Sequence, residues 1–118
     1  MDKEQGGVND SDNPVQIHSR DYWFKVVGML QQNWALIEPR VGGTGLAVHF
    51  IDDQSGVFDR LDFADAASAE RALRHNGFAP FAEDAQAQRF LRPPQPPFRT
   101  TRHCNGPIYS SGRFWQQP

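Results

Sequence analysis

Six residues near the C-terminus form the densest group of side chains that could do chemistry. They combine cationic with aromatic groups, and they are Arg99, Arg102, His103, Tyr109, Arg113 and Trp115. Arginine guanidinium groups fork onto phosphate or carboxylate, and aromatic rings stack on bases and other flat groups. The pattern would therefore suit an anionic ligand or single-stranded nucleic acid. The simpler interpretation is a packed tail whose arginines pair with acids elsewhere in the chain.

The charge of the chain is divided unevenly between its two ends. All 14 acidic residues lie within residues 1–84, whereas residues 89–118 contain five arginines and no acid. The net charge of −2 gives no overall attraction to nucleic acid. Such an asymmetry indicates an interaction surface, or an intramolecular match between a basic tail and an acidic body. No RNA-binding signature or phosphate-binding loop accompanies the basic segment, so nucleic-acid binding stays the alternative hypothesis.

Two further places could carry an enzyme. His103 and Cys104 are adjacent and could form an activated thiolate, but no acid lies nearby in sequence to orient the imidazole. Asp59 shares the inward side of a predicted strand, which requires either a β-bulge or a salt-bridge partner such as an arginine. Neither pattern supports catalysis strongly, so we expect a non-enzymatic protein.

The four histidines do not have metal-ligand spacing, and one cysteine cannot build a structural zinc site. We therefore expect no metal and no cofactor. His49 is expected to be a partly buried side chain within the sheet.

The central part of the chain predicts an antiparallel meander. Four short runs of β-branched and aromatic residues predict strands, at 22–30, 34–38, 46–51 and 57–63. Residues 31–33, Gln-Gln-Asn, have the composition of a turn, and the other connections are also short. The fold class is therefore α+β with a four-stranded sheet over about residues 22–63.

Helices are predicted after the sheet. A main helix covers about 66–76, because Asp65 can cap its N-terminus and Gly77 suits a left-handed C-cap. A shorter helix is predicted over about 82–91. It must end before the Pro-rich connector at 93–97, since proline cannot continue a helix.

Apolar residues occur on both faces of the predicted sheet, and one main helix can cover only one of them. In the third strand, Val48 and Phe50 oppose His49 and Ile51. We expect the irregular C-terminal segment, residues 98–118, to cover the second face. The alternatives are the short helix or a second subunit.

The composition divides the chain into a polar leader and a domain. Residues 1–20 are polar with few aliphatic side chains, which predicts a disordered leader, and residues 21–118 are predicted to be a single α+β domain. No apolar run has the length of a membrane span, and the single cysteine favours a reducing, cytoplasmic setting. The favoured function is a small binding or protein-interaction module, whose partner is another protein or a second copy of the chain.

Overall fold

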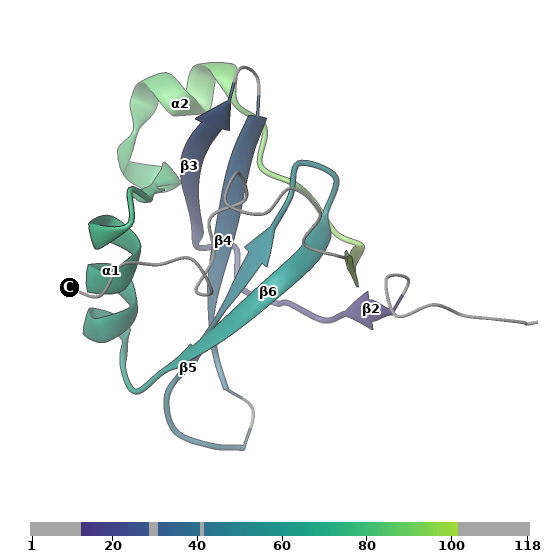
Figure 1. The fold of residues 1–118 in the computed structure, drawn as a ribbon, viewed down its shortest axis with the longest axis vertical. Helices are drawn as coiled ribbons and strands as arrows, with labels where there is room; N and C mark the ends of the chain where they lie inside the picture. The colour runs from purple at the N-terminus through teal and green to yellow at the C-terminus, as the bar shows by residue number, and fades with distance from the viewer. Residues whose placement is uncertain (1–12, 29–30, 41, 102–118) are drawn as a thin grey trace, which may run out of the picture.

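The computed structural model describes residues 13–28, 31–40 and 42–101. This part of the chain forms one seven-stranded sheet with helices packed beside it (Figure 1). The strands are β2 (Pro14–Val15), β3 (Tyr22–Gly28), β4 (Gln31–Pro39), β5 (Leu46–Ile51), β6 (Gly56–Phe63), β7 (Ala79–Pro80) and β8 (Phe98–Thr100). The helices are α1 (Ala66–His75), the 3-10 helix η2 (Phe81–Glu83) and α2 (Ala85–Phe90). The α+β class is confirmed.

The predicted meander forms the centre of the sheet. The strand order is β2-β8-β6-β5-β4-β3-β7, and β3 to β6 are consecutive antiparallel neighbours. The sheet is larger than the predicted four strands, because three strands of two or three residues extend its two sides. One of them, β8, runs parallel to β6, so the sheet is mixed. Such short strands have no apolar alternation by which a sequence could predict them.

Residues 31–33 belong to β4, so the predicted turn there is wrong. Asn33 pairs in register with Lys25 of β3 and is fully buried. Amide side chains are common in turns, but cross-strand pairing with β3 decides the conformation of this segment. The strand therefore starts three residues earlier than predicted.

Helix α1 begins and ends through the predicted local signals. The Asp65 carboxylate accepts a hydrogen bond of 2.8 Å from the backbone N–H of Ser68. At the other end Gly77 has a φ of +91°, and the N–H of Phe78 donates to the carbonyl of Leu73 at 2.9 Å. This is the six-to-one bond of a Schellman C-cap. The second helix is shorter than the predicted 82–91, since α2 is preceded by the separate turn η2.

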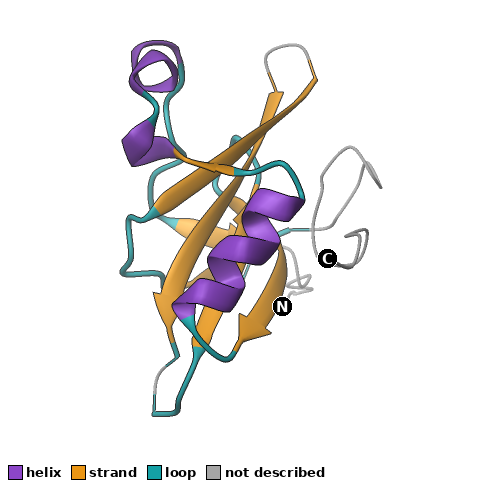
Figure 2. Ribbon diagram, turned by 90° about the vertical axis from the view of Figure 1, so that its left-hand side faces the viewer, coloured by secondary structure: helices purple, strands orange, loops and turns teal. Residues whose placement is uncertain are grey.

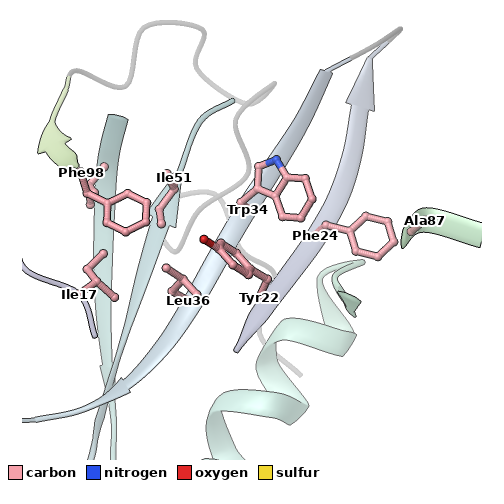
Figure 3. Close-up of a cluster of buried hydrophobic side chains, with 9 residues drawn as sticks. Ile17, Tyr22, Phe24, Trp34, Leu36, Ile51, Ala87 and Phe98 are labelled. Carbon is pink, nitrogen blue, oxygen red and sulfur yellow. The ribbon is translucent and has the colours of Figure 1, made fainter. Parts of the chain in front are cut away.

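Two apolar clusters lie on opposite faces of the sheet. Helix α1 covers one face, as Figure 2 shows, and its Ala69 and Leu73 pack there against strand residues such as Trp23 and Phe50. The second cluster contains nine buried residues: Ile17, Tyr22, Phe24, Trp34, Leu36, Ile51, Val57, Ala87 and Phe98 (Figure 3). Both faces are therefore apolar and covered, as the strand pattern predicts.

The cover of the second face comes from three segments. Ala87 belongs to α2, which supports the alternative that the short helix covers this face. Phe98 of β8 is 2% exposed, and the Tyr22 hydroxyl donates to the carbonyl of Pro94 in the Pro-rich connector. The remaining residues of the predicted cover, 102–118, lie outside the described residues.

The third segment is Pro14–Arg20, which we call the strap. Its Ile17 is 4% exposed within the second cluster, and Pro14 pairs with Arg99. Residues 13–20, which the composition assigns to the leader, thus include side chains that pack against the sheet. The composition of the segment is polar, but two aliphatic side chains and the pairing with β8 are enough to hold it. Residues 1–12 lie outside the described residues.

Candidate functional site

Of the six predicted C-terminal site residues, Arg99 lies within the described part of the chain. Arg99 is exposed in β8 and pairs in register with Pro14. The other five predicted site residues, together with Cys104, lie outside the described residues: Arg102, His103, Tyr109, Arg113 and Trp115. The prediction of a site at these residues therefore stays a prediction.

The described chain contains a different candidate site around the strap. Three cavities adjoin there, with volumes of about 290, 400 and 370 Å³. The first two share His49 and Arg60, the first and third share Gln16, and the second and third share Val15. We call them the floor cavity (290 Å³), the edge cavity (400 Å³) and the proline cavity (370 Å³), and together the strap recess. Ligand sites are commonly concave regions of this size.

His49 and Arg60 form the shared wall between the floor and edge cavities. They lie directly opposite each other on β5 and β6, so their side chains share one face of the sheet. Side chains alternate along a strand, and His49 therefore lies on the same face as the buried Ile51. The apolar face of the sheet thus turns polar toward the N-terminal end of β5.

His49 is 8% exposed, so it lies in the sheet as predicted and is more deeply buried than the predicted partly buried position. Its pKa is lowered, first by burial, which disfavours the charged ring, and then by the Arg60 guanidinium. The carboxylates of Glu38 and Asp62 act in the opposite direction but do not outweigh these effects. His49 is therefore neutral at pH 7 and can both donate and accept a hydrogen bond.

The acids of the floor are already engaged within the protein. One oxygen of Glu38 accepts from the backbone N–H groups of His18 and of Ser19, the latter at 2.8 Å. The Arg60 Nε lies 3.0 Å from a carboxylate oxygen of Asp62, and both side chains are about half exposed. Glu38 thus joins the strap to β4, while Arg60 lines both the floor and the edge cavity.

Arg20 is held in one orientation at the end of the strap. Its Nη1 donates to the carbonyls of Ile17, at 2.7 Å, and Ser19. Its guanidinium carbon lies 5.5 Å from the centroid of the Phe98 ring, which is a cation–π distance. The fixed guanidinium lines the proline cavity, where exposed Pro96 and Pro97 form part of the wall.

Asp59 lies beside a β-bulge, one of the two possibilities that its position predicted. Phe50 pairs with Asp59 and Ile51 with Val57, so Phe58 is the extra residue of β6. The Asp59 carboxylate accepts a 2.8 Å bond from the N–H of Arg60 and borders the edge cavity. Its pairing with a backbone N–H gives it a structural role.

Other kinds of site find less support in the described chain. Among residues 13–28, 31–40 and 42–101, no three His, Cys, Asp or Glu side chains are grouped so that they could hold a metal ion. No helix in this part of the chain combines the length and apolar character that crossing a membrane requires. No family model, curated protein or solved structure matches the chain.

The residues of the strap recess carried a weak signal in the sequence. Glu38 and Arg40 continue the face of β4 on which Leu36 is buried, and His49 precedes Ile51 on the same face of β5. A strand face that changes from apolar to charged marks where a sheet leaves the core. Arg20 had no such signal, because its position depends on strap contacts with distant residues.

Proposed function

We propose that this chain is a small, non-enzymatic binding module, and that its ligand presents anionic groups to the strap recess. The observation that carries the proposal is the adjoining of three cavities around one strap, with a guanidinium group in each. Arg40 and Arg60 line the floor cavity, Arg60 lines the edge cavity and Arg20 lines the proline cavity.

The balance of charge favours an anionic ligand. The acids that border the recess, Glu38 and Asp59, accept hydrogen bonds from backbone N–H groups of the protein itself. Arg20, Arg40 and Arg60 line the cavities, and guanidinium groups bind carboxylate and phosphate oxygens in forked pairs. The neutral His49 ring adds one N–H group that can donate a hydrogen bond to a carboxylate or to a phosphate oxygen.

A free molecule and an acidic side chain of a partner protein would present the same chemistry. The proposal therefore includes the protein-interaction module predicted from the sequence, and moves its binding site from the C-terminal segment to the strap. The cytoplasmic location that the single cysteine favours is part of the same proposal.

The test is a titration followed by amide chemical shifts, with citrate as the free anion and hexaglutamate as the peptide. We expect saturable shifts confined to the strap and to residues around His49 and Arg60. The double variant Arg40→Gln/Arg60→Gln should weaken binding at least about tenfold, which is roughly the loss of one charge-assisted hydrogen bond. Arg71→Gln, an exposed arginine on α1 away from the recess, is the matched control.

The two ligands separate the sources of the anion. Binding of hexaglutamate alone indicates a protein partner, and binding of citrate indicates a small molecule. Shifts that scatter evenly over exposed arginines such as Arg71, or that fail to saturate with both ligands, would refute the proposed function.

A further inference from the structure

The proline cavity differs in its chemistry from the other two parts of the strap recess. The residues that line it include Arg20, His18 and three prolines, Pro14, Pro96 and Pro97, and none of them is acidic. The floor and edge cavities each contain a carboxylate, from Glu38 and Asp59 respectively. Of the three cavities, the proline cavity is therefore the one whose lining holds no carboxylate to repel an anion.

Contacts within the protein already fix the orientation of the Arg20 guanidinium, which favours forked pairing with an anion. Both hydrogens of its Nη1 are used by the carbonyls of Ile17 and Ser19, and the ring of Phe98 supports one face of the guanidinium. The Nη2 and Nε groups have no hydrogen-bond partner in the described part of the chain. A guanidinium that is already oriented loses little side-chain entropy on binding, which favours affinity.

Prolines form an apolar part of the wall beside Arg20. Pro14, Pro96 and Pro97 are exposed, so their rings are accessible to a ligand, and half-buried Val15 also lines the cavity. Rigid rings offer a planar partner an apolar contact without ordering costs of their own. A cavity of about 370 Å³ has room for one aromatic ring and its anionic substituent.

We propose that the proline cavity binds a small aromatic molecule that carries a carboxylate or a phosphate. The anionic oxygens pair with Nη2 and Nε of Arg20, and the ring lies against the prolines. This inference rests on the proposed function, because it assigns the ligand chemistry of one part of the same recess.

The test compares four probes on the complete chain by amide chemical shifts of Val15, Ile17 and Phe98. Benzoate carries ring and charge, benzyl alcohol the ring alone, acetate the charge alone, and phenyl phosphate the ring with a phosphate. We expect benzoate or phenyl phosphate to bind with a dissociation constant of the order of millimolar, at least about tenfold more tightly than benzyl alcohol and acetate. The stronger of the two identifies the anion.

Variants at Arg20 then test the fork. Arg20→Gln should weaken the aromatic anion about tenfold without affecting benzyl alcohol, and Arg92→Gln, an exposed arginine outside the cavity, should change nothing. Because Arg20→Gln removes contacts within the strap, its amide spectrum must first show the native fold. Arg20→Lys keeps the charge but not the fork, and should still weaken binding at least about threefold.

The outcomes separate this inference from the broader function. Equal binding of benzoate and benzyl alcohol, or full affinity in Arg20→Lys, would overturn the proline-cavity assignment. If citrate binding still depends on Arg40 and Arg60 in that case, the proposed function stands and only the assignment fails. If benzoate binds through Arg20 but neither citrate nor hexaglutamate binds, the proline-cavity assignment stands and the broader proposed function fails.

Discussion

Replacing Ile17 with alanine tests whether the strap is part of the folded domain. Ile17 is 4% exposed and packs in the second apolar cluster, which also contains residues from β3, β4 and β8 (Figure 3). The change removes three carbon atoms, each worth about 0.8 kcal/mol when buried, and leaves a cavity that the surroundings fill only partly. We expect the free energy of unfolding to fall by about 2.5–4 kcal/mol.

Urea unfolding followed by tryptophan fluorescence measures this loss, since Trp34 lies in the same cluster and is fully buried. The melting temperature should fall by roughly 8–15 °C for a chain of this size. His18→Ala is the matched control, because the His18 side chain is exposed while its backbone N–H bond to Glu38 remains. The control should change stability by no more than about 0.5 kcal/mol.

The reasoning would be refuted by an Ile17→Ala variant as stable as its His18→Ala control. Burial of Ile17 would then contribute nothing, and the ordered domain would begin near residue 20, as the composition of the leader predicted. A large loss of stability in both variants would instead indicate that the strap tolerates no substitution. In that case Gln16→Ala, at an exposed neighbouring residue, should also destabilise the protein.

Three further perturbations test the cap, the strap anchor and the buried imidazole. Gly77→Ala should destabilise the protein by about 1 kcal/mol in urea unfolding, because its φ of +91° strains any residue with a Cβ; an unchanged midpoint would contradict the left-handed cap. Glu38→Gln should cost about 1–2 kcal/mol by the same assay, since two backbone N–H groups lose a charged acceptor; exchange of the strap amides no faster than before would argue against the anchor. The lowered pKa of His49 means that the unfolded chain binds the proton more tightly, so the stability due to this group is present above about pH 6.5 and is lost as the pH falls through the folded pKa. His49→Gln should therefore flatten the decline of the melting temperature between about pH 7 and pH 5, and an imidazole that titrates at or above its ordinary pKa in NMR would show that the burial argument is wrong.

The parts of the fold that the sequence predicted are those that local signals determine. Asp65 and Gly77 act within one helical turn, so the ends of α1 could be found from neighbouring residues alone. The alternation around His49 likewise needs only the next residues of β5. The prediction failed where distant residues decide, as at Asn33, whose strand conformation depends on pairing with Lys25.

The candidate site could not have been found in this way, because its members come from segments far apart in the chain. Arg20, Arg40 and Arg60 are separated by about twenty residues each, and no motif connects them. Phe98, which supports Arg20, reaches the strap only through the pairing of β8 with β2. The composition of the C-terminal segment was a stronger signal in sequence, and residues 102–118 of that segment lie outside the described residues.

The strap has two roles that a single variant would change together. It covers the second apolar cluster through Ile17, and it separates the three cavities through Val15 and Gln16. A ligand that bridges the strap and the sheet binds only when the strap is in place, so its binding must stabilise the strap by the same free energy. Ile17→Ala, which loosens the strap without changing any charge of the recess, should therefore weaken citrate binding, and saturating citrate should restore part of the lost stability. If citrate bound Ile17→Ala as tightly as the unchanged protein, the strap would not belong to the binding site.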